Sequence, residues 1–286
     1  MKVFLKDASI VFVFIIAIML PVEWLAKKTT NDSSIKRDYI ENHHSRIKTL
    51  LLGHSHFECS FNPHVLGDSA YILAQVGRKI FFDVQLANKY FPLMENLETV
   101  IYSINIGDMD PGGDFALDWV AYAKTYGIYP KTFPENIQSR SLFFSHQFSK
   151  NWFMLQVTVD SLGYAAKKVT WDGKRVEFNP TRKTSEAVHS YAAQLTELAK
   201  ICQAHDARFI AVACPLSNLY LEKLTEEFYT DINSVVDEVR ACYPLEFHDY
   251  TQDSLFRADT LFMDVNHLNH TGATLFAQRV KQDFGL

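Results

Sequence analysis

The chain has 286 residues, of which 48% are hydrophobic and 21% are charged, and its formal net charge is -5. This is the composition of an ordinary globular protein with enough apolar residues for a sizeable core. The acidic balance lacks the basic excess that is typical of nucleic-acid binding, so we expect no nucleic-acid partner.

Residues 1–26 are predicted to form an N-terminal membrane helix. An uncharged run, Ala8–Val22, lies between lysines and is near the lower limit of about 17–25 residues for a spanning helix. We favour an uncleaved anchor over a cleaved secretory signal, because no small-x-small cleavage site follows the run and Trp24 resembles an interfacial flank. With either interpretation the rest of the chain is extracytoplasmic, in the periplasm or on the outer face of the inner membrane.

The four cysteines do not have the spacing of a zinc or CxxC site. Cys202 and Cys242 each lie near a predicted helix end, and export would permit a disulfide between them. Buried free thiols are the alternative.

After a polar linker at residues 27–46, short apolar runs alternate with stretches of helical periodicity. Apolar runs of this length, bounded by Gly, Pro or Asn, are typical of parallel strands that are covered on both faces. We expect strands at residues 47–52, 70–74, 99–104, 208–214 and 245–248.

Helical spacing of apolar residues is found over residues 188–202 and 224–239, and a last helix is expected to begin near Asn269, a suitable N-cap residue. Alternating strands and helices predict an α/β fold for residues 47–286, a three-layer α/β/α sandwich with a mostly parallel five-stranded sheet.

Residues from about 108 to 184 interrupt this alternation. Asp172-Gly173 lies between two β-prone runs and favours a hairpin at residues 169–176. We interpret the stretch as an insertion over the carboxyl edge of the sheet, where such segments often form substrate walls or lids. A packing elaboration without function is the alternative.

Two short motifs at opposite ends of the chain carry the candidate chemistry. Gly53-His54-Ser55-His56 follows the first expected strand, and Asp264-x-x-His267 precedes the last helix. Both should lie at the carboxyl edge of the sheet, where ligands of such folds bind. A serine hydroxyl becomes a strong nucleophile when a base takes its proton and a third group orients that base. We therefore predict a catalytic set of Ser55 as nucleophile, His267 as base and Asp264 as the orienting carboxylate.

Acyl transfer also needs donors for the developing oxyanion. Candidates are the amide of Ser55, the amide of Gly77 after the second strand, and the side chain of Asn105 at the end of the third. The structural alternatives are that Gly77 is an ordinary turn glycine and that the Asn105 side chain makes a hydrogen bond within its loop.

His54 and His56 also permit a metal hypothesis, because His-x-His is a frequent ligand pair that Asp264 and His267 could complete. The serine hypothesis requires neither a metal nor another cofactor.

Gly53-His54-Ser55-His56 together with Asp264-x-x-His267 resembles the SGNH/GDSL hydrolase superfamily over residues 47–286. The resemblance implies a flavodoxin-like fold and motifs that carry a serine, a glycine, an asparagine and an Asp-x-x-His. His54 stands where the usual first motif has aspartate. With the N-terminal anchor, the chain looks most like the extracytoplasmic group around the alginate O-acetylation proteins and the D-alanyl transfer protein DltD.

That resemblance implies hydrolysis or transfer of an ester-linked acyl group, acetyl foremost, on a cell-envelope polysaccharide or glycan. It also implies a membrane-bound O-acyltransferase as a partner. A non-catalytic carbohydrate-binding or scaffold protein and a metal-dependent hydrolase are the alternative hypotheses.

Overall fold

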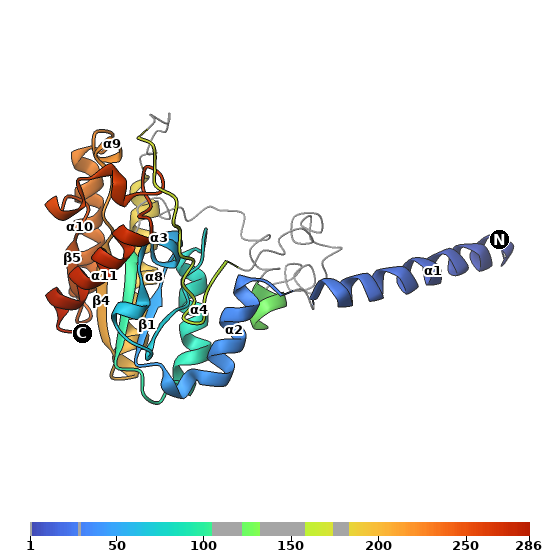
Figure 1. Cartoon of the computed structure of the whole chain (residues 1–286). Coiled ribbons are helices and arrows are strands. Elements are labelled where there is room, and N and C mark those ends of the chain that lie inside the picture. Colours follow the sequence, from blue (N-terminus) through green and yellow to red (C-terminus); the bar gives the residue numbers. More distant parts are fainter. Residues whose placement is uncertain (1, 28–29, 105–121, 132–157, 174–182) are drawn as a thin grey trace. The chain divides into compact units, whose positions relative to one another are not determined.

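The computed structural model describes residues 2–27, 30–104, 122–131, 158–173 and 183–286 (Figure 1). Clustering of contacts divides the chain into two compact units, one of residues 1–37 with 114–157 and one of residues 38–113 with 158–286. The second unit contains a sheet of five parallel strands in the order β2-β1-β3-β4-β5, which confirms the predicted α/β fold class. The strands are β1 (Thr49–Leu52), β2 (Ala70–Ile72), β3 (Thr99–Ile104), β4 (Arg208–Ala213) and β5 (Glu246–Asp249).

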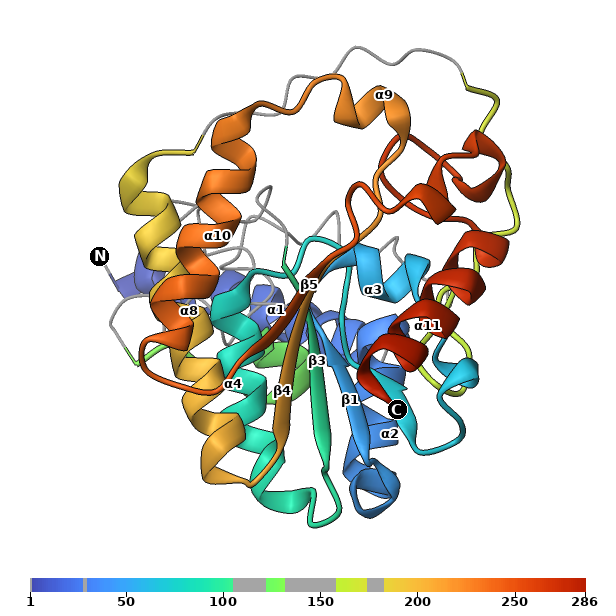
Figure 2. The ribbon, with the colours of Figure 1, turned by 90° about the vertical axis from the view of Figure 1, so that its left-hand side faces the viewer.

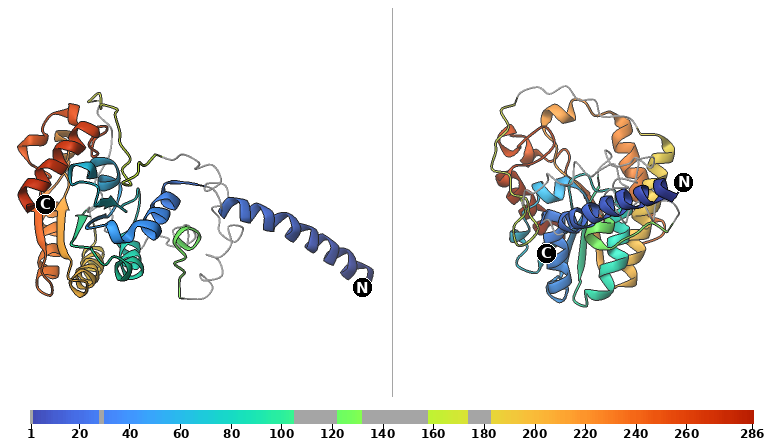
Figure 3. Two further views of the ribbon diagram at one scale, coloured as in Figure 1. Left: turned by 60° about the horizontal axis from the view of Figure 1, so that its bottom comes forward. Right: turned by 90° about the vertical axis from the view of Figure 1, so that its right-hand side faces the viewer.

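Helices cover the sheet on two faces. On one face α4, α8 and α10 lie together, and on the other α3 packs against α11 (Figure 2). The left view of Figure 3 shows α8 in yellow beside α4 in teal. The bounds of the helices around the sheet are α3 (Ser55–Ser60), α4 (Ile80–Tyr90), α8 (Ser185–Ala204), α9 (Asn218–Leu221), α10 (Glu226–Arg240) and α11 (His270–Phe284).

The core follows from the apolar patterns. All residues of β2 and β3 are buried, as expected for strands with helices on both faces. Ile232, Val235, Val236 and Val239 of α10 are buried, so the helical spacing correctly identified most of its inner face. Asn269 caps α11, as predicted, because its side-chain oxygen accepts hydrogen bonds from the amides of Thr271 and Gly272, each at 3.1 Å.

The residues expected to form a polar linker include a helix, α2 (Asp32–His43), and a 3-10 turn, His44–Arg46. Asn31 and Ser34 cap the start of α2 reciprocally, since each backbone amide donates to the other side chain at 2.9 Å. Ile40 is fully buried. Lys36 is fully buried as well. The helix is short and mostly polar, so its caps and two buried side chains define it better than any apolar periodicity does.

Much of the expected insertion at residues 108–184 lies outside the described residues. Residues 122–126 are helical, and residues 158–173 contain no helix or strand. The second segment covers the edge of the sheet, because the amide of Ile72 in β2 donates to the carbonyl of Leu162 at 2.9 Å. Gly163 allows this approach: its φ is +79°, and a Cβ there would lie 2.2 Å from the carbonyl oxygen of Ile72. The predicted hairpin at residues 169–176 extends beyond the described residues, and its described part has no strand.

The N-terminal segment forms one helix, α1 (Lys2–Lys27). Its stretch Lys6–Leu25 has 20 residues, a mean hydropathy of 2.4 and no buried residue. At 1.5 Å per residue such a helix spans about 30 Å, the thickness of the hydrocarbon core of a bilayer. The segment is therefore long and apolar enough for a membrane anchor or a signal sequence.

Candidate active site

Ser55 is presented at the carboxyl edge of the sheet, the upper edge in Figure 2, by a sharp turn after β1. Gly53 makes the turn with a φ of +120°, and a Cβ there would lie 2.3 Å from the hydroxyl oxygen of Ser103 on β3. Only glycine suits both this backbone conformation and this close approach. His54 is the N-cap of α3 and Ser55 its first residue, so the amide of Ser55 makes no hydrogen bond within the helix.

The structure brings the three predicted catalytic side chains together. The Ser55 hydroxyl lies 2.8 Å from His267 Nε2. His267 Nδ1 lies 3.0 Å from each carboxylate oxygen of Asp264. Because a carboxylate only accepts, Nδ1–H donates to Asp264, which leaves the lone pair of Nε2 to accept from the serine hydroxyl. This is the arrangement in which an imidazole can remove the serine proton.

Asp264 is held in its ionised form. Burial alone raises the pKa of its carboxyl, but hydrogen bonds from the His267 ring and from the amides of Asn266 and His267 outweigh that effect, so the pKa lies below its usual value. The ionised carboxylate fixes the tautomer of His267 and stabilises the imidazolium that forms when the ring takes a proton.

Backbone bonds between its two ends, and a side-chain bond at its middle, hold the loop that carries Asp264 and His267. Phe262 and Leu268 form an isolated antiparallel bridge, and the amide of Met263 donates to the carbonyl of His267 at 2.9 Å. The buried Ser217 donates its hydroxyl to the carbonyl of Val265 at 2.5 Å. The loop is thus held in one conformation from the β4 side of the sheet.

The two motifs meet, 212 residues apart, because α3 is attached to the start of α11. The buried amide of Leu268 donates to the hydroxyl of Ser60 at 2.9 Å. Asn62 adds two bonds, from its amide to the carbonyl of Ala273 at 3.3 Å and from its side chain to the hydroxyl of Thr274 at 3.0 Å. These contacts position the serine helix relative to the histidine loop.

The β2–α4 loop carries the predicted oxyanion residue Gly77. Residues Gln75–Arg78 form a turn closed by a bond of 3.1 Å from the amide of Arg78 to the carbonyl of Gln75, with Gly77 at a φ of +70°. A glycine with positive φ at the third position is typical of a type II turn. The part of the chain that the structure describes leaves the space beside the Gly77 Cα open. Its role as a donor stays a prediction, and Asn105 lies outside the described residues.

Two buried charged residues that the sequence did not single out hold this loop. Glu58 on α3 accepts from the amide of Val76 at 2.7 Å. Arg78 donates to the carbonyl of Leu73 at 2.5 Å and pairs with Asp83 on α4 at 3.4 Å, and both side chains of that pair are fully buried. In the sequence, such residues could have been found as charged side chains beside apolar residues, since a charged side chain that is buried usually has a bonding partner.

His54 and His56 lie against each other, with their Nδ1 atoms 3.0 Å apart. Within the described ranges, no three His, Cys, Asp or Glu side chains are arranged to hold a metal ion. Both nitrogens of His267 are engaged, by Ser55 and by Asp264.

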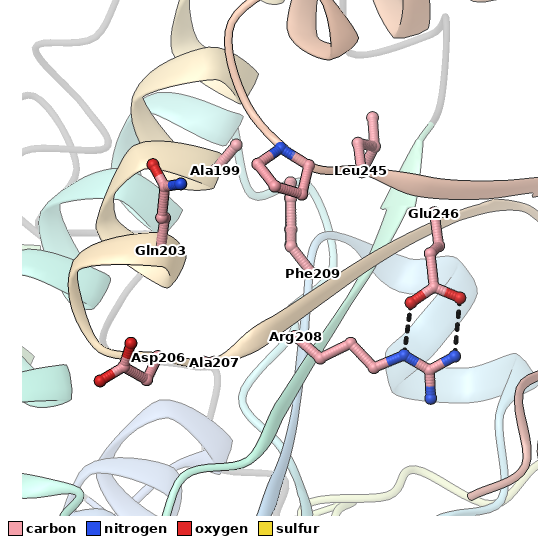
Figure 4. A pocket seen from close by; sticks show the side chains of 9 residues that line it. Ala199, Gln203, Asp206, Ala207, Arg208, Phe209, Leu245 and Glu246 are labelled. Carbon is pink, nitrogen blue, oxygen red and sulfur yellow. Dashed lines mark hydrogen bonds and ion pairs between the residues drawn. The ribbon is translucent and has the colours of Figure 1, made fainter.

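A small cavity of about 20 Å³ lies beside His56 at the carboxyl edge. Apolar side chains of β3 and α10, including Ile104 and Phe228, line it together with Cys214 and Thr251. Its volume suits one water molecule or one methyl group. A wider pocket, of about 340 Å³, lies at the opposite edge of the sheet, around Arg208 and Glu246 (Figure 4).

All four cysteines are free thiols; Cys59, Cys202 and Cys214 are buried and Cys242 is exposed. Burial raises the pKa of the Cys202 and Cys214 thiols, which therefore stay protonated and unreactive.

No protein-family model matches the chain, and no curated protein matches it. Among solved structures, the chain is similar to one described as "a putative platelet activating factor from Streptococcus pneumonia". The two chains are 13% identical, the likeness covers 94% of this chain and 98% of that one, and the TM-score is 0.48. A likeness this distant carries no argument about activity, so the functional conclusion rests on the geometry of the site.

Proposed function

We propose that the chain is a serine-dependent esterase or O-acyltransferase that acts through an acyl-enzyme on Ser55. The observation that carries this proposal is the continuous contact from Ser55 through His267 to Asp264, with 2.8 Å and 3.0 Å separations at the carboxyl edge of the sheet. Such a set activates a hydroxyl for attack on an acyl carbon.

The reaction then proceeds in two halves. Ser55 Oγ attacks the ester carbonyl carbon while its proton passes to His267 Nε2. The bond from the acyl carbon to the leaving oxygen breaks, and His267 returns the proton to that oxygen. Water or an acceptor hydroxyl next attacks the acyl-enzyme and gives its proton to His267, which reprotonates Ser55. Asp264 stabilises the imidazolium in both halves.

The oxyanion donors in this proposal are the amides of Ser55 and Gly77 and the side chain of Asn105. The turn geometry of Gly77 supports its part, because a glycine there lets a ligand approach the backbone closely. Esterase and transferase differ only in whether water or a sugar hydroxyl reaches the same acyl-enzyme.

For the substrate, we propose an acyl group, acetyl first, on a cell-envelope polysaccharide or glycan. For the location, we propose that α1 anchors the enzyme in the membrane with its catalytic unit extracytoplasmic, where a membrane-bound O-acyltransferase would be its partner. The supporting features are the 20-residue apolar stretch in α1 and the motif resemblance described above.

The experiment measures turnover of a chromogenic acetyl ester by the full chain in detergent, with and without an acetylated oligosaccharide. Ser55→Ala should abolish turnover, and a chelator should leave it unchanged. Loss of activity with the chelator and bound metal in the purified protein would overturn the serine mechanism in favour of metal-dependent hydrolysis. Normal acyl content in cells that carry Ser55→Ala would favour the non-catalytic scaffold.

A further inference from the structure

We propose that His56 is a positioning residue, which holds the imidazole of His267 in reach of Ser55 by packing against its ring. This inference rests on the proposed function of Ser55. It gives a role to the second histidine of the His54-Ser55-His56 sequence, which the triad itself does not use.

The ring of His56 lies directly beside the ring of His267. Their centroids are 4.7 Å apart with an angle of 31° between the planes. The His56 residue is 5% exposed and the His267 side chain 18%, so the contact is largely shielded from water. The imidazole of His267 is thus limited on three sides, by Asp264, by Ser55 and by the ring of His56.

The polar atoms of His56 fix its ring within the serine motif. Its Nδ1 lies 3.0 Å from Nδ1 of His54, the N-cap residue of the same helix. That His54 nitrogen also accepts from the backbone amide of His56 at 3.4 Å, so it carries no hydrogen. The hydrogen between the two rings therefore belongs to His56, whose Nδ1–H donates to His54.

The groups that face His56 favour its neutral form. Burial is the largest influence and holds the pKa of His56 well below its usual value, and the neighbouring His54 and His267 rings lower it further, while the backbone of Asn266 raises it. From the other elements, the facing groups are the Cys214 thiol after β4, the Thr251 hydroxyl after β5 and the apolar Phe228 and Ile232 of α10. Burial raises the pKa of the Cys214 thiol, so it also stays uncharged.

A neutral His56 has a consequence for the reaction. When Ser55 gives its proton to His267, the new imidazolium meets the ring of an uncharged neighbour instead of a second cation. A positive charge on His56 would oppose that proton transfer, since the two rings are in contact. The neutral ring therefore restricts the movement of the base without placing a second positive charge beside it.

The first test needs no variant. Nitrogen-15 NMR of the histidine rings in the full chain, between about pH 6 and 8, should show His56 neutral and protonated at Nδ1, since burial depresses its pKa and Nδ1 donates to His54. A His56 that is charged over this range, or protonated at Nε2 alone, would overturn the bond that fixes its ring beside His267 and with it the inference.

The second test compares two substitutions. His56→Phe keeps a ring beside His267 and loses the N–H to His54, whereas His56→Gln keeps an N–H donor and loses the ring. Misplacing a catalytic group by about 1 Å can lower rates about 100-fold, so we expect kcat for an acetyl ester and the rate of Ser55 labelling by a fluorophosphonate to fall about ten- to hundredfold in His56→Gln, with KM unchanged. His56→Phe should lose less, because it retains the ring contact. His189→Gln, at an exposed position on α8, is the matched control.

The outcomes separate this inference from the proposed function. If the wild type is not labelled and does not turn over ester, the proposed function fails. If the wild type is active and both His56 variants match it in kcat and labelling, the positioning role fails while the serine mechanism stands. An increase in KM with unchanged kcat would also contradict the positioning role, because it would place His56 in substrate binding.

Discussion

The two edges of the sheet differ in how their polar side chains are paired. At the carboxyl edge, the Ser55 hydroxyl lies 2.8 Å from His267 Nε2, and we propose that its oxygen attacks the substrate. At the amino edge, Arg208 makes two bonds to the Glu246 carboxylate (Figure 4). It makes a third, of 2.7 Å, to the carbonyl of Phe284.

The amino edge has the wider pocket, yet its guanidinium is already satisfied by the protein itself. The carboxyl edge has the smaller cavity, but its Ser55, His267 and Asp264 side chains are arranged as a nucleophile with its base and an orienting carboxylate. The proposed function therefore rests on the arrangement of these side chains and not on the size of a pocket.

The largest effect should come from the triad. Ser55→Ala should reduce ester turnover to background, and Asp264→Asn should lower kcat about 10⁴-fold, because an amide favours the wrong tautomer of His267. Steady-state kinetics on the full chain test both. An Asp264→Asn enzyme that keeps more than about a tenth of wild-type kcat would contradict the role of the carboxylate.

The same carboxylate predicts a dependence of stability on pH. The pKa of Asp264 is depressed in the folded protein, so its contribution is present above the unfolded pKa and is lost as the pH falls through the folded value. The difference in melting temperature between wild type and Asp264→Asn should therefore shrink below about pH 4. A constant difference from neutral to acid pH would contradict this prediction.

A substitution of Gly53 should destabilise the turn after β1 at the carboxyl edge of the sheet. Gly53→Ala places a Cβ at positive φ and 2.3 Å from the Ser103 hydroxyl, so we expect a loss of about 1–3 kcal/mol from backbone strain alone, with further loss from the clash. Urea unfolding measures the stability. Gly67, whose φ is also positive, has no described atom within 4 Å of an added Cβ, so Gly67→Ala is a control for strain without a clash.

The β2–α4 loop should respond to Glu58. Glu58→Ala removes the buried acceptor of the Val76 amide, which should cost about 1–3 kcal/mol. If Gly77 binds the oxyanion, kcat should fall and KM should not change. Unchanged kcat in a folded Glu58→Ala protein would remove the loop from the proposed oxyanion site.

The smallest effect should come from the amino edge. Arg208→Ala should leave kcat and KM unchanged and cost at most about 1 kcal/mol, since the Arg208–Glu246 pair is more than a third exposed and screened by solvent. A tenfold loss of ester turnover would show that the two edges are coupled and would weaken the comparison.

The sequence predicts the parts of this site that local patterns encode. The five strands and the Asp264-x-x-His267 loop were predictable because buried parallel strands are apolar runs and because chain order places their carboxyl ends together. The helix α2 was not, since it is polar and depends on the reciprocal caps of Asn31 and Ser34.

The other features that the sequence analysis did not predict depend on contacts between segments that are distant in the chain. The carbonyl of Val265 is fixed by Ser217, and the loop of Gly77 is fixed by Glu58, through bonds between residues that share no sequence pattern. The orientation of His56 toward His267 likewise depends on how α3 meets the final loop, and not on its place in the motif. Residues such as Ser217 and Glu58, which hold the loops of the site in place, were not predicted from the sequence. Their hydrogen-bond partners are distant in the sequence and are brought near only by the tertiary fold.

The most direct test of the account is the intact mass of the full chain in detergent after incubation with a chromogenic acetyl ester. The account predicts one acetyl adduct on Ser55, absent in Ser55→Ala and formed more slowly in Asp264→Asn. A folded wild-type protein that forms no adduct and turns over no ester would contradict the central claim that Ser55 is an activated nucleophile.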